Sequence, residues 1–493
     1  MARIAVIGAG TGAMAAAARL AVAGHRVTVY ERTETYGGAV RRVERDGFAF
    51  DTGPGLLTLP AVYRDLFVKT GKEPLEELVE LVQVDPSSRH LFADGTEVAL
   101  PNASRAGVVA ALDEALGAGA GARWGDFLVR AREAWDRTRR PLLEEPLWPN
   151  WQVLAEREPY PSVPHKRLLR TRRAATLAEV GAWELRDPRL TALLESHALA
   201  HGLDPRVAPA SAAVLPYLEH AFGTWYVRGG VRELARAVHE RCVARRVVFA
   251  FGAEVTGIVE KDGRAAGVEL ADGTVAEADH VVAGIDPVRL DGLTGHGLYG
   301  DRDVRPVPEA PRADRFTVLL ALRGARTAGA AHRTVVHTPD RVAELDFLSG
   351  ARPGAPARPT VTVLRPDDPA LRPDGEHESV VLSAVVPAGT EWSADGRGEA
   401  FADLLVGAAG AAVPELRERL LWREVRSGPA AVSAPALAGG GARFLYPANS
   451  TALAGLYRVG GSSHPGGGLP HAGMSGALVA GLIVEGPEFR GSR

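Results

Sequence analysis

The sequence predicts an α/β protein with a Rossmann-like nucleotide-binding domain and an inserted α+β domain. Three observations predict this class. The chain opens with an apolar strand, a glycine-rich turn and a helix within residues 3–22, and it closes with a second glycine-rich loop and a helix within residues 460–484. A long stretch, first helical and then rich in β-type segments, separates the two ends. Strands that alternate with helices are typical of a parallel sheet.

Composition excludes several classes. The 493 residues include 57 basic and 60 acidic side chains, a net charge of −3, so the chain lacks the basic surplus typical of a nucleic-acid-binding protein. Cys242 is the one cysteine and forms no internal disulfide. We find no run of about 20 mostly apolar residues that would predict a membrane span. Glycine is enriched, with 56 residues, and its position in the chain is therefore informative.

The N-terminal segment has the pattern of a dinucleotide-binding unit. Residues 3–7 form a short apolar strand, and Gly8 and Gly10 allow a tight turn in which the backbone approaches a pyrophosphate. The helix that follows offers free N–H groups to the phosphates. Residues 26–30 predict a second strand, and Glu31 at its end is placed to bind ribose hydroxyls. We therefore expect a dinucleotide cofactor.

A second glycine-rich patch favours FAD over NAD. Gly37-Gly38 follows shortly after Glu31, and the strand-like residues 46–51 run into the loop 52–55. This loop places a backbone turn where a flavin ring could lie, whereas an NAD-dependent dehydrogenase has no evident use for it. An ordinary surface turn is the alternative interpretation.

The middle of the chain predicts a hairpin at 89–100 that turns on Asp94-Gly95, and mainly helices from 103 to 220. A helix over 231–245 and a strand over 247–251 follow. Further expected elements are β-rich segments at 315–323, 333–338, 360–365 and 379–386 and a helical segment at 399–421.

The C-terminal segment repeats the strand, glycine loop and helix arrangement. Residues 456–459 predict a strand, 460–468 a loop and 473–484 a helix. The N-terminus of such a helix can stabilise negative charge on a reduced flavin ring.

Together these segments resemble the phytoene desaturase branch of FAD-dependent carotenoid dehydrogenases, within the wider flavin amine-oxidase fold. The similar segments span the chain, and the glycine-rich element 464–468, His-Pro-Gly-Gly-Gly, is the most specific. The others are the N-terminal fingerprint with Glu31 and Gly37-Gly38, and residues 46–60, 225–230, 252–255, 281–287 and 461–463.

The resemblance implies a binding site for FAD. Gly8, Gly10, Thr11 and Gly12 would hold the pyrophosphate, Glu31 the adenosine ribose, and the backbone of Val255 the adenine. Gly53, Pro54, Gly461 and Met474 would lie near the isoalloxazine ring. The predicted cofactor-binding set also contains Ala13, Arg32, Gly38, Ala39, Gly55, Gly284 and Gly473.

Three positions depart from the family's pattern. Ala39 stands where Arg or Lys is common, and Arg41 or Arg42 could substitute. Gly284 stands where Asn is common, and His471 where apolar residues are usual. These departures concern the identity of the substrate more than the binding of FAD.

The implied reaction is dehydrogenation of a carbon–carbon bond, with hydride transfer to flavin N5 and loss of a proton from the neighbouring carbon. The protein then mainly aligns the reactants and excludes water. The sequence suggests no hydrolytic triad and no metal site. The candidate catalytic side chains are His464, Tyr226 and Arg228. A structural loop role for His464, and packing or ion-pair roles for Tyr226 and Arg228, are the alternatives.

The helical insertion contains candidate substrate contacts. Trp148, Trp151 and Tyr160 could line a lipophilic tunnel or form core. The amphipathic segment 135–140 could dock on a membrane as an entrance helix, or it could be a solvated basic helix.

The predicted enzyme is a phytoene desaturase-like, FAD-dependent oxidoreductase acting on a carotenoid or related isoprenoid. Its discontinuous, glutathione-reductase-like FAD-binding domain comprises 1–65, 225–290 and 431–493, and its substrate-binding domain comprises 66–224 and 291–430. We expect a cytoplasmic protein with a lipophilic small-molecule substrate and peripheral membrane contact. An FAD-dependent amine oxidase or a saturase-type reductase is the alternative, and a flavin-binding protein without activity is a more distant one. The electron acceptor, the direction of the reaction and the oligomeric state stay open.

Overall fold

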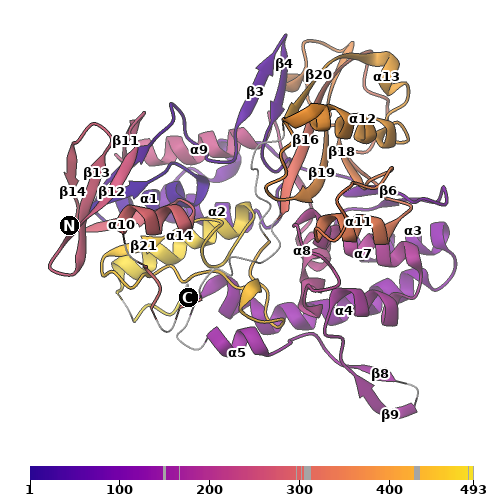
Figure 1. Ribbon diagram of the computed structural model, residues 1–493, viewed down its shortest axis with the longest axis horizontal. Helices are drawn as coiled ribbons and strands as arrows, with labels where there is room; N and C mark the ends of the chain where they lie inside the picture. Colours follow the sequence, from indigo (N-terminus) through magenta and orange to yellow (C-terminus); the bar gives the residue numbers. More distant parts are fainter. Residues whose placement is uncertain are drawn as a thin grey trace.

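The computed structural model describes residues 1–147, 151–165, 167–295, 297–300, 303–304, 313–426, 434–486 and 488–491. Trp148, a candidate tunnel residue, lies outside them. The described residues form three packed units (Figure 1): a nucleotide-binding unit on the left, a seven-stranded sheet at upper right and a helical unit at lower right.

A five-stranded parallel sheet is the centre of the nucleotide-binding unit. Its order is β11-β2-β1-β15-β21, and every neighbouring pair is parallel. Val6 in the central strand pairs with Val29 on one side and Val282 on the other. The strands are β1 (Arg3–Ile7), β2 (Arg26–Glu31), β11 (Val248–Phe251), β15 (His280–Ala283) and β21 (Leu456–Arg458).

Both faces of this sheet are covered. On one face, Val6 and Val29 share a core with α1 (Thr11–Val22), α2 (Ala61–Thr70), α9 (Val231–Ala244) and α14 (Leu469–Val484). On the other face, Ala5 and Ile7 pack under the meander β12 (Val255–Lys261), β13 (Arg264–Leu270) and β14 (Val275–Glu277), and under α10 (Pro287–Thr294). Burial on both faces explains why the strands are apolar without alternation.

The order of the strands fixes the place of the crevice. From β1 the chain passes through α1 to β2 on one side, while β15 and β21 lie on the other side of β1. Ligands of open α/β sheets bind at such a switch point, outside the carboxyl ends of the strands. The turn after Ile7, the end of β2 and the loops after β15 and β21 all lie at this edge.

The second sheet has seven strands in the order β20-β16-β19-β18-β17-β6-β7, antiparallel except between β17 and β6. Helix α12 (Arg397–Ala409) packs on one face with α11 (Arg341–Leu348) nearby. Phe48 and Phe50 of the hairpin β3 (Arg42–Arg45) and β4 (Phe48–Asp51) pack against Leu319 and Ala321 on the other face. The strands are β6 (Ser88–Leu91), β7 (Glu97–Leu100), β16 (Ala313–Arg323), β17 (Arg333–Val336), β18 (Val361–Leu364), β19 (His377–Pro387) and β20 (Leu420–Arg426), and α13 (Leu416–Arg419) precedes β20.

The helical unit has its own core. Its main helices are α3 (Arg105–Leu116), α4 (Ala120–Arg139), α7 (Pro188–Ala200) and α8 (Val214–Phe222), with the short α5 (Trp151–Glu156) and α6 (Leu177–Val180). Tyr160 is fully buried in that core and donates to Glu184, whereas Trp151 is partly buried. The hairpin β8 (Val163–His165) and β9 (Arg167–Arg172) extends away from the body (Figure 1). Strand β5 (Leu81–Gln83) pairs with β10 (Trp225–Val227) where this unit meets the first.

Three expected elements differ from the structure. The last helix begins at Leu469 instead of residue 473, because Pro470 fits the first turn, where its missing N–H costs nothing. The expected helix 399–421 ends at Ala409, and β20 then pairs with β16. Within residues 103–220, expected to be mainly helical, residues 163–165 and 167–172 instead form the hairpin β8–β9.

No described helix combines the length and the apolar character that a bilayer crossing requires.

Candidate functional site

The turn after β1 forms a cradle for phosphate. Gly10 caps α1 with φ −69° and ψ 161°, and no side chain of the described residues caps the helix. The first-turn N–H groups of an α-helix have no acceptor within the helix, so those of α1 remain available. A Cβ built on Gly10 meets no described atom within 4 Å. The space beside Gly10 is therefore open at the point where a pyrophosphate would approach the helix N-terminus.

Glu31 is held at the same turn. Its Oε2 accepts a hydrogen bond of 2.9 Å from the N–H of Ala9, and its Oε1 accepts from the N–H and Oγ1 of Thr33. The carboxylate is 7% exposed and keeps acceptor capacity for a ribose hydroxyl. The N–H of Ala253 donates to the carbonyl of Glu31, which brings Val255, two residues later, to the same end of the sheet.

Four separate segments meet around α1 because glycines allow close approach. A Cβ on Gly12 would lie 2.7 Å from the carbonyl oxygen of Ala472 and 2.9 Å from the Cα of Gly460. A Cβ on Gly38 would lie 3.0 Å from the Cα of Gly10. Gly284 contacts the same turn: its own Cβ would lie 2.9 Å from the Cβ of Ala13. The two glycine-rich ends of the chain are therefore neighbours in the fold.

The loop 52–55 lies beside the double-glycine segment. A Cβ on Gly53 would lie 3.0 Å from the carbonyl oxygen of Ala39, and Gly53, Gly55 and Tyr226 line a small pocket. Asp51, which opens onto this pocket, accepts hydrogen bonds from the first N–H groups of α9. Burial raises the pKa of Asp51 to about 6, against the lowering effect of those hydrogen bonds.

The three candidate catalytic side chains lie in structural contacts. His464 is fully buried, and its Nε2 is 2.9 Å from the carbonyl oxygen of Glu145. Tyr226 donates to Asp368 at 2.7 Å. Arg228, more exposed, donates to the carbonyl of Asp367. Tyr226, in β10, and Arg228, directly after it, both contact residues 367–368, whereas His464 contacts another segment. A catalytic role for each stays a prediction.

The remaining predicted cofactor residues are placed as follows. Arg32 and Ala39 are exposed, and Gly461 is partly buried at the loop after β21. Gly473 faces α2, because its Cβ would lie 2.9 Å from Val62. Met474 packs against the core of the helical unit. The Arg41 side chain donates to the carbonyl of Gly38 and to Thr33, so it does lie at the double glycine.

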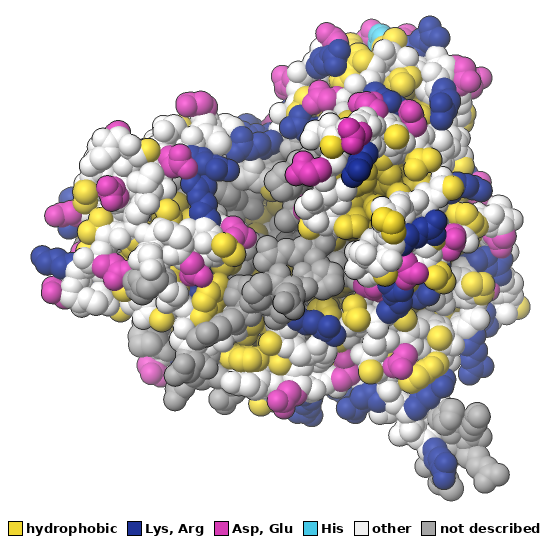
Figure 2. All heavy atoms as spheres, in the orientation of Figure 1, with side chains coloured by type: hydrophobic (Ala, Val, Ile, Leu, Met, Phe, Trp, Pro, Cys, Tyr) yellow, Lys and Arg dark blue, Asp and Glu magenta, His cyan; other side chains and the backbone are white. Residues whose placement is uncertain are grey.

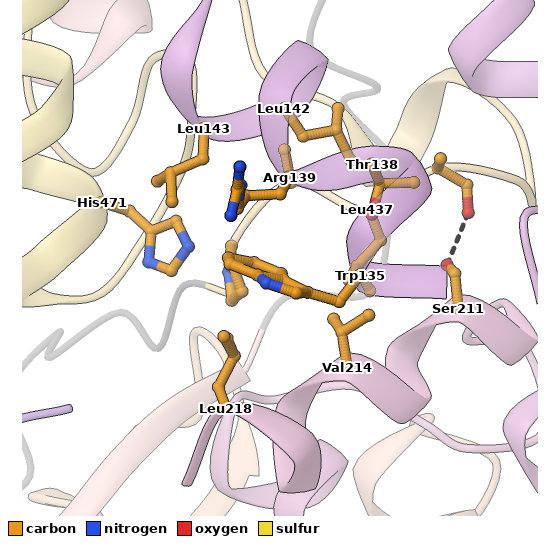
Figure 3. A pocket seen from close by; sticks show the side chains of 13 residues that line it. Trp135, Thr138, Arg139, Leu142, Leu143, Ser211, Val214, Leu218, Leu437 and His471 are labelled. Atoms are coloured by element: carbon orange, nitrogen blue, oxygen red, sulfur yellow. Dashed lines mark hydrogen bonds between the residues drawn. The ribbon is translucent and has the colours of Figure 1, made fainter. Parts of the chain in front are cut away.

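A mostly apolar cavity lies between the helical unit and the start of α14 (Figure 3). Trp135 and Leu142 come from α4 and the turn after it, Val214 and Leu218 from α8, and Leu437 from the loop before β21. His471, in the first turn of α14, points into it. The cavity therefore adjoins the segment that packs on Gly12.

Sequence reasoning did not anticipate several of these residues. The segment 135–140 has a buried and an exposed face. Trp135 and Thr138 are buried at the cavity. Asp136 is on the exposed face, where it pairs with Arg132 of the same helix. The spacing of Trp135, Thr138 and Leu142 is the helical signal that could have identified the inner face. Asn449, which donates to Ser475 and to the carbonyl of His464, had no local signal.

The site fits FAD. An open cradle beside Gly10, an uncapped helix N-terminus and a carboxylate at the end of β2 match the pyrophosphate and ribose of a dinucleotide. The start of α14 lies next to that cradle, on the path to the apolar cavity. A long cofactor can thus extend from the sheet edge toward the substrate.

Comparison with known proteins agrees with this arrangement. The family model for flavin-containing amine oxidoreductases matches residues 14–484. The hydroxyneurosporene desaturase of Rhodobacter capsulatus is 30% identical over 497 residues, which cover 98% of this chain and 97% of the relative. The 4,4'-diapolycopene oxygenase of a Methylomonas species is 28% identical over 505 residues, 98% of each chain. The neurosporene-forming phytoene desaturase of Cereibacter sphaeroides is 28% identical over 527 residues, 99% of this chain and 96% of the relative.

Solved structures share the fold. An oxidoreductase from Methanosarcina mazei superposes with a TM-score of 0.65 at 18% identity. The matched region covers 97% of this chain and 99% of the chain of that oxidoreductase. A putrescine oxidase bound to putrescine has a TM-score of 0.62 at 13% identity and covers 98% of this chain and 99% of its own. At these identities the similarity establishes the architecture alone.

Proposed function

Because the chain belongs to the flavin-containing amine oxidoreductase family, we propose that it dehydrogenates carbon–carbon bonds of a carotenoid or a related isoprenoid. It is an FAD-dependent oxidoreductase with a Rossmann-like FAD-binding domain and a substrate domain. The observation that carries the substrate class is similarity along the whole chain to relatives named for neurosporene and phytoene desaturation. The apolar cavity beside α14 supports it.

The chemistry that FAD would supply when bound is acceptance of the hydride from one carbon, while the neighbouring carbon loses a proton to solvent. The chain's own residues have three tasks. The N-terminus of α1 and the Glu31 carboxylate hold the dinucleotide, and the N-terminus of α14 favours negative charge near it. Trp135, Leu142 and Leu218 provide apolar walls, which exclude water and align a long apolar chain.

Expression in a host that makes phytoene, neurosporene or hydroxyneurosporene tests the proposal. We expect a product with a longer conjugated system and with two hydrogen atoms fewer for each step, seen by absorbance and mass. Gly10→Ala, which fills the cradle and weakens FAD binding, is the matched control and should give less product. A product that gains an oxygen atom, or a flavin that none of the three compounds reduces in the absence of air, would overturn the proposed dehydrogenation.

We also propose that the FAD-binding domain comprises 1–65, 225–290 and 431–493, and the substrate-binding domain 66–224 and 291–430. Shared cores support this division, because α1, α9, β15 and α14 pack together while α4, α7 and α8 pack among themselves. The surface is hollowed between the nucleotide-binding unit and the units on the right (Figure 2).

Peripheral membrane contact through the hairpin β8–β9 completes the proposal. A lipophilic substrate resides in a bilayer, and the segment 165–173 contains Lys166 and four arginines. The hairpin projects from the body, and Arg170 and Arg173 are exposed. We expect Arg170→Glu with Arg173→Glu to reduce co-sedimentation with anionic lipid vesicles, while Arg358→Glu, an exposed control far along the chain, leaves it unchanged. Equal sedimentation of the two variants would contradict this docking site.

A further inference from the structure

The apolar cavity beside α14 is lined by few polar groups, which are the side chains of Thr138, Arg139, Ser211 and His471 and the indole N–H of Trp135. Thr138 donates to the carbonyl of Ala134 at 2.7 Å, and Ser211 donates to the carbonyl of Ala438. Arg139, half exposed at the rim, pairs with Glu144 at 3.0 Å. The hydroxyl protons of Thr138 and Ser211 are thus used within the protein, and the Arg139 guanidinium lies at the rim, where solvent reaches it.

Two groups have no hydrogen-bond partner among the described residues: the indole N–H of Trp135, which can only donate, and the ring of His471, which can also accept. The second of these, His471, is 8% exposed, it points into the cavity (Figure 3), and neither of its ring nitrogens has a hydrogen-bond partner among the described residues. Burial lowers its pKa to about 3, so the ring is neutral at pH 7. A neutral imidazole has one N–H donor and one acceptor nitrogen.

An unpaired donor and acceptor in an apolar cavity are unfavourable unless a ligand pairs with them. A pure hydrocarbon cannot do so, whereas a hydroxyl, ether or carbonyl oxygen can. The walls formed by Trp135, Leu218 and Leu437 suit the apolar remainder of such a molecule.

We propose that His471 hydrogen-bonds an oxygen function on the substrate, so that the enzyme prefers an oxygenated isoprenoid to the corresponding hydrocarbon. This inference rests on the proposed function and deepens it, since it names the class of carotenoid. His471 acts as a specificity-determining residue, and apolar contacts bind the rest of the chain.

The test compares hydroxyneurosporene with neurosporene on the purified, FAD-loaded enzyme. Two quantities are measured for each compound: kcat/KM for anaerobic reduction of the flavin, and Kd from the change in the flavin spectrum on binding. We expect the wild type to favour the hydroxylated compound about tenfold in both, the size of one net hydrogen bond to a buried partner.

Variants at one position separate polarity from shape. His471→Leu should lower the preference to near one by weakening only the hydroxylated ligand, and His471→Gln, which keeps a donor and an acceptor, should restore part of it. Leu218→Ala is the matched cavity control and should weaken both compounds alike. Flavin content and unfolding temperature confirm that each variant is folded.

Each outcome has a distinct meaning. A wild type that binds the two compounds equally, or a preference unchanged in His471→Leu, overturns the role of His471 while the proposed dehydrogenation stands. If neither compound reduces the flavin or changes its spectrum, the proposed function fails and the inference fails with it. If both Leu218→Ala and His471→Leu lose the preference for hydroxyneurosporene, the preference depends on the shape of the cavity, and the inference is also overturned.

Discussion

Gly10 and Gly12 lie two residues apart in the cradle, yet a methyl group at each should have opposite consequences. At Gly10 a Cβ meets no described atom within 4 Å, and φ is −69°, which alanine adopts readily. At Gly12 a Cβ would lie 2.7 Å from a backbone oxygen of Ala472. Gly10→Ala therefore occupies ligand space, and Gly12→Ala occupies space that the protein fills itself.

The magnitudes follow from these distances. Gly12→Ala forces α1 and α14 apart, because the contacted atoms belong to backbone, and overpacking of this kind costs about 1–3 kcal/mol in the free energy of unfolding. Gly10→Ala has two opposing effects on the free energy of unfolding: alanine is a poorer N-cap residue, and it lowers the entropy of the unfolded chain. These effects nearly cancel, so the free energy of unfolding should change by about 0.5 kcal/mol or less. The added methyl group would occupy the open space where the pyrophosphate would bind, so FAD affinity should fall at least about tenfold, or about 1.4 kcal/mol.

The assay uses apoprotein. Urea unfolding gives the free energy of unfolding without cofactor, and titration with FAD, followed by quenching of flavin fluorescence, gives Kd. Gly10→Ala should lose affinity with unchanged apoprotein stability, and Gly12→Ala should lose both. A Gly10→Ala protein that binds FAD as tightly as the wild type, or whose apoprotein is destabilised as much as Gly12→Ala, would refute the assignment of the cradle.

Three further predictions concern stability in urea. The pKa of Asp51 is about 6 in the folded state and near 3.8 in the unfolded state, so the protonated carboxyl stabilises the fold fully below pH 4. This stabilisation, about 3 kcal/mol in the free energy of unfolding, is lost as the pH rises through 6. Asp51→Asn should remove this part of the pH dependence, and curves of unfolding free energy against pH that run parallel for the two proteins would exclude it. Tyr63→Phe removes the hydrogen bond of 2.9 Å from α2 to the carbonyl of Leu469 in α14 and should lower the free energy of unfolding by about 1 kcal/mol. An unchanged free energy of unfolding would show that α2 does not anchor α14 through this bond. Glu378→Gln leaves the buried Arg365 guanidinium without its carboxylate and should lower the free energy of unfolding by about 3–5 kcal/mol. A decrease below about 1 kcal/mol would mean that water solvates the ion pair.

Local patterns predicted the elements whose causes are local. The strand β1, the turn at Gly8, helix α1 and the acid at the end of β2 follow one another within 31 residues, and periodicity with a capping glycine specifies each of them. The same holds for the hairpin that turns on Asp94-Gly95, found as β6 and β7. Helix α14 was predicted too, with its start placed at residue 473 instead of Leu469.

Elements that depend on distant partners were not predictable in the same way. Strand β20 contains leucines and arginines that suit a helix, and it is extended because Thr317 and its neighbours in β16 pair with it across a hundred residues of chain. The cavity has the same origin, since its walls combine α4, α8 and the start of α14. His471 stood out in the sequence only as a departure from an apolar pattern, and its unpaired ring became meaningful once the apolar walls were known.

The glycine enrichment now has a structural reason. Nine glycines lie within residues 1–55 and nine within 460–486, and the fold packs the two segments on each other. A Cβ on Gly476 would lie 2.6 Å from the carbonyl oxygen of Gly12, and one on Gly12 would contact Ala472, so α1 and α14 approach closely only because both positions lack side chains. That approach sets the first turn of α14, with His471 facing the cavity, beside the phosphate cradle. The chain thus uses glycine both to admit the cofactor and to place the substrate cavity next to it.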